Sequence, residues 1–398
     1  MSNFQVRVQP IFIKAHPNAD RLELGNIGSR DGWQVVVGAG RFQTGDLVAY
    51  IGENAVVPEW VLKKYGYWDE AKNKGLLAGS KGDRVRMVKL RDEPSLGICI
   101  PVSESHNFDD EAGTTYTDYF LEEEYVEEGD DVAELLGVTK YEAPIPIAMS
   151  GEVFNAGTTI GVNYDIEDLN NYPDVLQEGE EVQVTVKLHG TNCQLVFLNS
   201  EGADDLVDWK AHSDNNYSTI GSKGLAAKGL YFKDNEANAN NVYFRATNHI
   251  REALLIAIGP LFETAPFGNK MVTVVGEVFG AGIQAGFNYG SAIVTFRIFD
   301  VYVGTRGMGR YLDDAELDTF CAIADVLRVP VIYRGPYKRD IIEALTNAPE
   351  SEFQCTHVRE GTVTKPVVER RQSRLGRVAL KLRSIAYMSR KGDVTEYQ

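Results

Sequence analysis

Alternating apolar and polar residues predict a strand that begins near Val182 and ends at Lys187. Valine recurs at every second position of this stretch, which is the pattern of a half-buried strand. A polar turn follows, and its Gly190 permits either a positive φ or a close approach of the backbone to a ligand. A lysine at the end of a buried strand can lose solvation, so that its pKa falls and its amine becomes a nucleophile. A surface lysine before a loop is the alternative interpretation.

The first third of the chain has an all-β pattern, with short strands between Gly, Asn and Asp turns at a spacing typical of a small barrel. An acidic stretch at 122–131 is expected to be solvated or disordered. A short helix at 131–136 stops at Gly137, and the prolines of 143–147 indicate a linker. We therefore predict one domain at residues 1–140 and another at 150–398. The predicted strands of the first domain are Phe4–Ile13, Trp33–Gly38, Asp46–Ile51 and Arg84–Leu90.

The second domain has a mixed pattern of helices and strands. Helices are predicted at Asn241–Ile258, stopped by Gly259 and Pro260, and at Asp313–Leu327, with an aspartate as cap. The glycines of 280–286 have the wrong spacing for a dinucleotide-binding loop. The expected fold class is therefore α+β. Its predicted strands are Met271–Phe279, Ile293–Tyr302, Gly361–Val367 and Ala379–Leu382.

Charge and cysteine content limit the range of functions. The 398 residues carry a formal net charge of −17, which argues against a generally basic nucleic-acid coat but not against a local basic groove. The N-terminus lacks the features of a signal peptide, and no apolar run is long enough to span a bilayer. The four cysteines have neither zinc-site nor CxxC spacing. We therefore expect a cytoplasmic protein with reduced thiols and no membrane contact.

The first domain also carries one basic stripe. The segment 16–24, HPNADRLEL, and the strands that follow it resemble the OB-type barrel of tRNA-binding EMAP-like domains. OB barrels bind nucleic acid on basic faces, and a solvated barrel face is the alternative interpretation. The candidate nucleic-acid-binding residues are Arg84, Arg86, Lys89 and Arg91.

Several charged residues interrupt otherwise apolar strands of the second domain. A charge in such a strand is costly unless it is paired, binds a metal or faces a cleft. Lys381 and Arg383 alternate, so both side chains lie on one face of their strand. A salt-bridged core, or strand ends that reach solvent, is the alternative. The other members of this set are Glu277, Asp300, Glu360 and Lys365, with the aromatic Phe299 next to Asp300.

The second domain resembles covalent nucleotidyltransferases, which comprise DNA ligases, RNA ligases and mRNA capping enzymes. The motifs that carry this resemblance are, in chain order, KLHGTN, GSKG, GEVFG, FRIFDVYV, EGTVTKP and LKLRS. Two features resemble those of ATP-dependent RNA ligases that carry their OB module first: the histidine of KLHGTN and the OB-like first domain. The resemblance implies an OB-like β-barrel followed by a nucleotidyltransferase domain of antiparallel sheets and helices. It also implies ATP and Mg²⁺ or Mn²⁺ as cofactors, and RNA as the substrate.

The same resemblance implies a role for each motif residue. Lys187 attacks the α-phosphorus of ATP and becomes lysyl-AMP, the AMP passes to a 5′-phosphate end, and a 3′-hydroxyl then displaces it. Phe299 stacks on adenine, Glu277 accepts the ribose hydroxyls, and Glu360 holds the divalent cation. The remaining assignments are Lys365, Lys381 and Arg383 at the α-phosphate, where the two lysines also lower the pKa of Lys187; Lys223 and Asp300 at the nucleotide; Asn192 at the nucleotide or acceptor end; and His189 near the pyrophosphate.

Three positions depart from the family pattern. Val186 stands where related RNA ligases often have a glutamate that reads adenine, so base specificity must come from elsewhere. Lys223 replaces an arginine, and Arg383 replaces a lysine. Because the first domain resembles that of nick-sealing relatives, we hypothesise a monomer that seals nicks with an RNA 3′-hydroxyl strand. The alternatives are a DNA ligase, a capping guanylyltransferase, or a catalytically silent OB-type RNA-binding protein.

Overall fold

The structure is a computed structural model, and it describes residues 4–109, 114–141, 149–199, 218–263 and 271–390. The chain forms two compact units. The first comprises residues 1–141 and 169–173, and the second comprises residues 142–168 and 174–398. The predicted linker at 143–147 lies outside the described residues.

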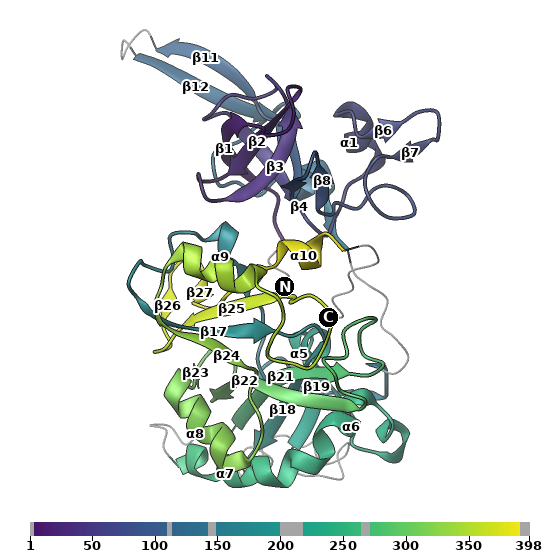
Figure 1. The fold of residues 1–398 in the computed structure, drawn as a ribbon, viewed down its shortest axis with the longest axis vertical. Coiled ribbons are helices and arrows are strands. Elements are labelled where there is room, and N and C mark those ends of the chain that lie inside the picture. The colour runs from purple at the N-terminus through teal and green to yellow at the C-terminus, as the bar shows by residue number, and fades with distance from the viewer. Residues whose placement is uncertain (1–3, 110–113, 142–148, 200–217, 264–270, 391–398) are drawn as a thin grey trace. The chain divides into compact units, whose positions relative to one another are not determined.

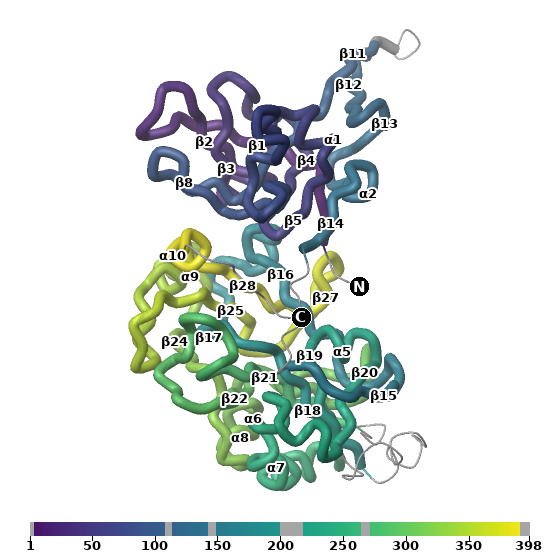
Figure 2. Tube along the Cα trace, turned by 90° about the vertical axis from the view of Figure 1, so that its right-hand side faces the viewer, coloured from purple at the N-terminus to yellow at the C-terminus, as the bar shows by residue number. Residues whose placement is uncertain are grey.

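The first unit is built on a five-stranded antiparallel sheet (Figures 1 and 2). Trp33, Val35 and Val37 are buried at alternate positions of β3, as the period-2 pattern predicts. The edge strands β3 and β10 lie in contact, so the sheet curls into a barrel around an apolar core. The order is β10-β4-β1-β2-β3, with β1 at Arg7–Ala15, β2 at Leu22–Ile27, β3 at Trp33–Gly38, β4 at Leu47–Gly52 and β10 at Gly97–Pro101.

Shorter elements surround this barrel, and the β11–β12 hairpin extends away from it in both views (Figures 1 and 2). The acidic stretch is ordered: Glu122 and Glu123 form a positive-φ turn, and Lys64 Nζ donates a 2.6 Å hydrogen bond to Glu122 Oε2. The elements are β5 (Ala55–Val56), α1 (Glu59–Lys64), β6 (Trp68–Asp69), β7 (Lys74–Gly75), β8 (Val88–Leu90), β9 (Glu93–Ser95), β11 (Ser103–Asp109), β12 (Thr114–Leu121), β13 (Glu124–Tyr125), α2 (Ala133–Leu136) and β14 (Thr139–Lys140).

The second unit contains a seven-stranded sheet that is covered on one face by helices (Figure 1). Leu195, Val274 and Ile298 of this sheet pack against Leu254 and Phe320 of the helices. The sheet order is β15-β20-β19-β18-β21-β22-β23. Its strands are Val153–Asn155, Leu230–Phe232, Ser218–Ser222, Thr191–Leu198, Met271–Gly280, Val294–Val303 and Arg310–Tyr311 in that order, and the helices are α5 (Lys223–Ala227), α6 (Val242–Thr247), α7 (Arg251–Glu263) and α8 (Asp314–Ala324).

A five-stranded sheet completes the second unit, in the order β16-β28-β25-β17-β24. Its pairs are antiparallel except for β16 and β28, which are parallel. The helix α9 covers the outer face of the sheet. The hydroxyl oxygens of Thr346 in α9 and Thr362 in β25 are 2.6 Å apart and share a hydrogen bond. The elements are β16 (Glu167–Asp168), β17 (Glu181–Lys187), β24 (Val331–Pro336), β25 (Gly361–Pro366), β28 (Leu380–Arg383), α9 (Arg339–Asn347), α10 (Ile385–Met388) and the small pair β26 (Arg371–Gln372) and β27 (Gly376–Arg377).

The α+β fold class is confirmed, and two element predictions are wrong. The helix expected at 241–258 is interrupted by a 3₁₀ turn at Asn248–Ile250 and continues through Pro260 to Glu263. Proline removes only one helical hydrogen bond, and its exposed position lets water satisfy the carbonyl left behind. The strand expected from Arg84 begins only at Val88, because Arg84 forms isolated bridges with other segments.

A pair of glycine substitutions tests the packing of the second unit. A Cβ at Gly276 would lie 2.3 Å from Phe296 Cζ and 2.4 Å from the carbonyl oxygen of Arg297. We expect Gly276→Ala to lower the free energy of unfolding by about 1–3 kcal/mol, because a packed ring has to move. Gly259→Ala meets no atom within 4 Å in α7, so it should raise that free energy by about 0.5–1 kcal/mol. Denaturation followed by circular dichroism measures both, and equal stability of the two variants would contradict this packing.

Candidate functional site

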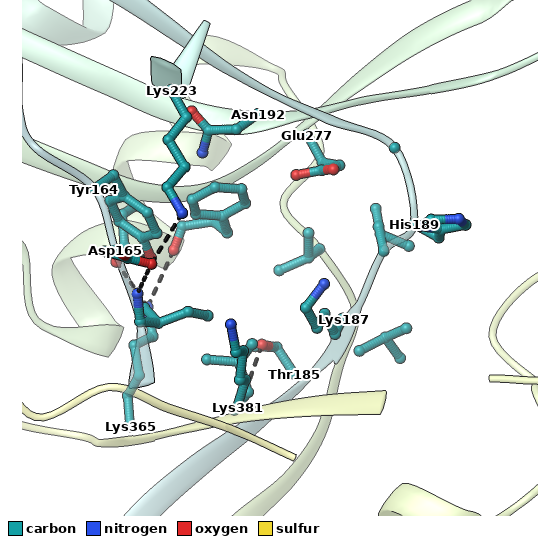
Figure 3. Close-up of a pocket in the computed structure, with 18 residues that line it drawn as sticks. Tyr164, Asp165, Thr185, Lys187, His189, Asn192, Lys223, Glu277, Lys365 and Lys381 are labelled. Atoms are coloured by element: carbon teal, nitrogen blue, oxygen red, sulfur yellow. Dashed lines mark hydrogen bonds and ion pairs between the residues drawn. The ribbon is translucent and has the colours of Figure 1, made fainter. Parts of the chain in front are cut away.

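The candidate site is a pocket in the second unit, lined by the facing surfaces of its two large sheets (Figure 3). In the five-stranded sheet, Thr185 pairs with Val363, which pairs in turn with Lys381. Alternate residues of a strand share a face, so Lys187 lies on the same side. The lining residues are Tyr164, Asp165, Ile166, Thr185, Val186, Lys187, Leu188, His189, Gly190, Asn192, Lys223, Glu277, Phe299, Asp300, Val329, Val363, Lys365 and Lys381.

A β-bulge shapes the wall formed by the seven-stranded sheet. The register between β21 and β22 shifts after Val275, and Phe299 is the residue of β22 that has no opposite. Ile298 and Val301, on either side of the bulge, both face the helix-covered core. A bulge changes the direction of the side chains around it, so the adjacent residues Phe299 and Asp300 both line the pocket. Sequence alternation alone does not predict this arrangement.

Two further predicted residues lie opposite each other on this wall. Asn192 of β18 pairs with Glu277 of β21, and both side chains lie at the pocket (Figure 3). Lys223 begins α5 and donates a 2.9 Å hydrogen bond to Asp165 Oδ1. Asp165 was not predicted from the sequence, because it follows no strand or motif pattern.

Lys187 ends β17, and its amine lies in the pocket (Figure 3). Its Nζ atom lies 2.5 Å from Oε1 of Glu360, the residue that precedes β25. The side chain of Lys187 is 17% exposed and that of Glu360 is 0% exposed. The nucleophile candidate is therefore held away from bulk water. The adjacent carboxylate stabilises its ammonium form, and this contact opposes the like-charge effect that was expected from Lys365 and Lys381.

The pocket cations differ in how they are neutralised. Lys187 pairs with Glu360, Lys223 pairs with Asp165, and Lys365 pairs with Asp300 at 2.7 Å. Lys381 makes no ion pair or hydrogen bond within the part of the chain that the structure describes, and its amine points into the cavity (Figure 3). Its positive charge is therefore directed at the pocket space.

Asp300 is fully buried and acts as the anchor of a charge cluster. Lys365 Nζ and Arg377 Nη2 each donate to its Oδ1 at 2.7 Å, and the hydroxyl of Tyr164 donates to its Oδ2. Burial opposes ionisation of Asp300, but the charges of Arg377 and Lys365 outweigh it and hold its pKa below the usual range. Burial also lowers the pKa of Lys365, more than Asp300 raises it. Asp300 therefore orients Lys365 and Tyr164 at the edge of the pocket.

His189 lies at the edge of the pocket, and its ring is directed away from the cavity (Figure 3). Its Nδ1 atom lies 3.3 Å from the hydroxyl of Tyr387, and its Nε2 atom lies 3.3 Å from Nη2 of Arg390. Nδ1 is also 3.8 Å from Glu360 Oε2. The next residue, Gly190, lines the pocket and also approaches a strand closely, because a Cβ there would lie 2.2 Å from the carbonyl oxygen of Val278.

Oxygen ligands for a divalent cation are present but sparse. The described residues contain no group of three or more His, Cys, Asp or Glu that could hold a metal ion. Mg²⁺ is commonly bound by one or two carboxylates together with substrate phosphates, not by a cage of protein ligands. Glu360, beside Lys187, and Glu277, in the pocket wall, fit that arrangement. Arg383 shares the strand face of Lys381 and lies opposite Gly361, but it is not among the lining residues.

The basic stripe of the first unit is only partly exposed. Arg84 is 5% exposed; its guanidinium lies over the ring of Tyr141 and donates a 2.6 Å hydrogen bond to Asn54 Oδ1. The prediction that Arg84 faces nucleic acid is therefore wrong, because its charge is used inside the unit. Arg86 is half-buried, whereas Lys89 and Arg91 are exposed on the β8–β9 hairpin. The predicted strand Arg84–Leu90 would have included both of the first two arginines, but β8 starts after them.

Two sequence expectations concern the whole chain. Among the described residues, no helix has the length and apolarity needed to cross a membrane. Cys99, Cys193 and Cys321 are buried free thiols, and Cys355 is a free thiol that is half-buried.

Comparisons with known proteins identify a family and a fold for this chain. The RNA ligase family model matches residues 180–383, and an OB-fold domain model matches residues 6–102. No curated protein matches the sequence. Among solved structures, a Naegleria gruberi RNA ligase mutant with AMP and Mn has a TM-score of 0.70 at 22% identity, covering 96% of this chain and 97% of that chain.

Two more structures of the Naegleria gruberi RNA ligase show the same fold. A mutant with ATP and Mn has a TM-score of 0.68 at 22% identity, covering 96% of this chain and 97% of that one. The form with PPi has a TM-score of 0.67 at 22% identity and the same coverage. The family model spans Glu360 and all four lysines that line the pocket, and the chain belongs to the RNA ligase family.

Proposed function

We propose that the chain is an ATP-dependent RNA ligase that joins 3′-hydroxyl and 5′-phosphate ends through a covalent AMP on Lys187. One observation carries this proposal: the Lys187 amine faces a pocket that also holds an aromatic ring and the Lys381 ammonium, which has no ion pair among the described residues. A nucleophile, a cation for phosphate and a flat surface for a base are the groups that nucleotidyl transfer needs. The similar folds bound to AMP, ATP and PPi support ATP as the nucleotide.

We assign residues on both walls of the pocket to parts of the nucleotide. Phe299 offers its ring to adenine, and Glu277 and Asn192 offer oxygen and amide groups to the ribose or acceptor end. Lys223, held by Asp165, provides a cation on the same wall. Lys365, braced by Asp300, and Lys381 provide cations on the other side (Figure 3).

The first chemical step follows from the position of Lys187. After losing a proton, its nitrogen attacks the α-phosphorus, the bond from that phosphorus to the bridging oxygen breaks, and pyrophosphate leaves. Glu360 Oε1, at 2.5 Å, is placed to receive that proton. Lys381 neutralises charge that develops on the α-phosphate. Mg²⁺ or Mn²⁺, held by Glu360 and the phosphates, would supply further positive charge when bound.

The later steps use the same pocket. A 5′-phosphate oxygen of the nucleic acid attacks the α-phosphorus of lysyl-AMP and releases the lysine. A 3′-hydroxyl then attacks the 5′-phosphorus, and AMP leaves. The cations Lys223, Lys365 and Lys381 remain in place for both displacements, because phosphoryl transfer depends mainly on positioning and charge stabilisation. Arg383 lies on the same strand face as Lys381, and we assign it to charge stabilisation at the α-phosphate.

The predicted N-terminal domain, residues 1–140, is proposed to bind the nucleic acid while residues 150–398 perform the chemistry. OB folds bind nucleic acid on exposed basic faces. Lys89 and Arg91 provide exposed cations on the β8–β9 hairpin, with half-buried Arg86 before them. The preferred substrate is an RNA-containing duplex with a nick whose 3′-hydroxyl strand is RNA, and the enzyme acts as a monomer in the cytoplasm.

Lys187→Ala tests the reaction class. The variant should lose all covalent label when incubated with α-labelled ATP and Mg²⁺, because no amine remains to attack the α-phosphorus. Denaturing electrophoresis measures the label. Wild-type protein labelled only by GTP would indicate a capping enzyme. Wild-type protein labelled by neither nucleotide would indicate a catalytically silent RNA-binding protein.

Lys381→Gln tests the proposed contact with the α-phosphate. We expect lysyl-AMP formation about 100-fold slower, since the variant loses one preorganised charge at the reacting phosphate. Arg371→Gln is the matched control, because Arg371 is an exposed cation on the nearby β26–β27 pair. Single-turnover labelling measures both rate constants. If the two variants reacted equally fast, Lys381 would have no place at the phosphate.

Lys89→Gln tests the role of the β8–β9 hairpin. Loss of one phosphate contact should reduce the slope of log affinity for a nicked RNA duplex against log salt concentration by about 1. Lysyl-AMP formation should not change. Lys338→Gln, which neutralises an exposed lysine before α9, is the control and should leave the slope unchanged.

Sealing assays test the proposed substrate. Nicks with an RNA 3′-hydroxyl strand should be joined faster than matched DNA nicks, and the opposite order would reject the proposed substrate.

A further inference from the structure

The loop at 281–293 joins β21 to β22 and lies against the turn at 188–190 that follows Lys187. Three contacts connect the two segments. The backbone N–H of His189 donates a 2.7 Å hydrogen bond to Tyr289 Oη, and Gln284 Nε2 donates a 2.9 Å hydrogen bond to the carbonyl oxygen of Gly190. The rings of Phe287 and His189 meet edge to face, with centroids 4.8 Å apart.

The turn is held on its other side by β21. A Cβ at Gly190 would lie 2.2 Å from the carbonyl oxygen of Val278 and 2.9 Å from Cγ of Glu277. The turn therefore lies between a strand and the loop, with no space to shift toward the strand. Because this turn begins directly after Lys187, its position sets the direction in which the end of β17 presents the amine.

Tyr289 of this loop is constrained by its backbone conformation and by its packing. Its φ is 53°, which is uncommon for a bulky side chain and costs conformational energy. The ring is 4% exposed and packs against Phe279, Phe353 and His357, with centroids 5.4, 5.0 and 4.4 Å away. Burial first, and then the charge of Glu360, raise the pKa of Tyr289 well above its usual value, so the phenol stays neutral. Packing thus holds a hydroxyl in a fixed place against the turn.

We propose that Tyr289, assisted by Gln284, is a positioning residue for nucleotidyl transfer: it fixes the turn after Lys187 and so aims the amine at the α-phosphorus. This inference rests on the proposed function. Neither side chain lines the pocket, so both act through the backbone of the turn. Misplacement of a reacting group by about 1 Å can cost about 100-fold in rate.

Tyr289→Phe tests this role, because it removes the hydroxyl and keeps the ring. It leaves the buried N–H of His189 without its acceptor, and we expect lysyl-AMP to form about 10-fold more slowly in a single turnover. The final fraction of labelled protein should equal that of wild type, and the half-saturating ATP concentration should stay within about twofold. The rate constant reports positioning, whereas the final labelled fraction counts folded, competent molecules.

Two further variants make the test decisive. Tyr333→Phe removes an exposed hydroxyl that donates a 2.8 Å hydrogen bond to the carbonyl of Pro336, and it should react at the wild-type rate. Gln284→Met removes the donor to Gly190 with little change in size, and it should slow the reaction as Tyr289→Phe does. It decides the question if Tyr289→Phe fails to fold.

The outcomes separate this inference from the proposed function. A wild-type rate constant in both Tyr289→Phe and Gln284→Met overturns the inference, while labelling of wild type leaves the ligase assignment intact. A wild-type rate constant with a lower labelled fraction also overturns it, since the loop would then support only folding. A wild-type chain that takes no label from ATP overturns the proposed function and this inference together.

Discussion

The contact between the Lys187 ammonium and the Glu360 carboxylate is the constraint around which the site is arranged. Nζ and Oε1 are 2.5 Å apart, and the carboxylate is completely buried. Both groups of such a pair lose hydration, so the pair adds little to the net stability of the fold. Its effect is to hold the Lys187 amine in a fixed position in the pocket. Two glycines permit the approach: Gly361 brings β25 against β28, and Gly190 brings the turn after Lys187 against β21.

Carboxylates also neutralise other lysines of the pocket. The chain carries a net charge of −17, yet its cleft gathers four lysines. Carboxylates neutralise Lys187, Lys223 and Lys365, so the cleft can stay assembled without a nucleotide. Asp300 serves two cations at once, Lys365 and Arg377. Lys381 differs from the other three lysines, because its charge has no protein partner among the described residues.

Local sequence patterns predicted the strands and the pocket residues that lie on them. The valines of β17 alternate with polar residues, so the face of Lys187 followed from the period of the strand alone. The partners of those residues were not predictable in this way. Asp165 meets Lys223 across 58 residues, and Arg377 meets Asp300 across 77, with no local pattern at either end. At Arg84 the local pattern itself was misleading, because the predicted strand begins only at Val88 and the Arg84 side chain is buried.

The structure also separates residues that touch the pocket space from residues that hold others in place, a distinction that a motif does not make. Phe299 and Asp300 are adjacent in one motif and both line the pocket, but the Asp300 carboxylate is also bound by Lys365 and Arg377 in a buried cluster. His189 follows Lys187 by two residues, but its ring nitrogens face Tyr387 and Arg390. The motif therefore contains two sets of residues. In the proposed reaction, the first set contacts the nucleotide, and the second set holds the first in position while charge develops.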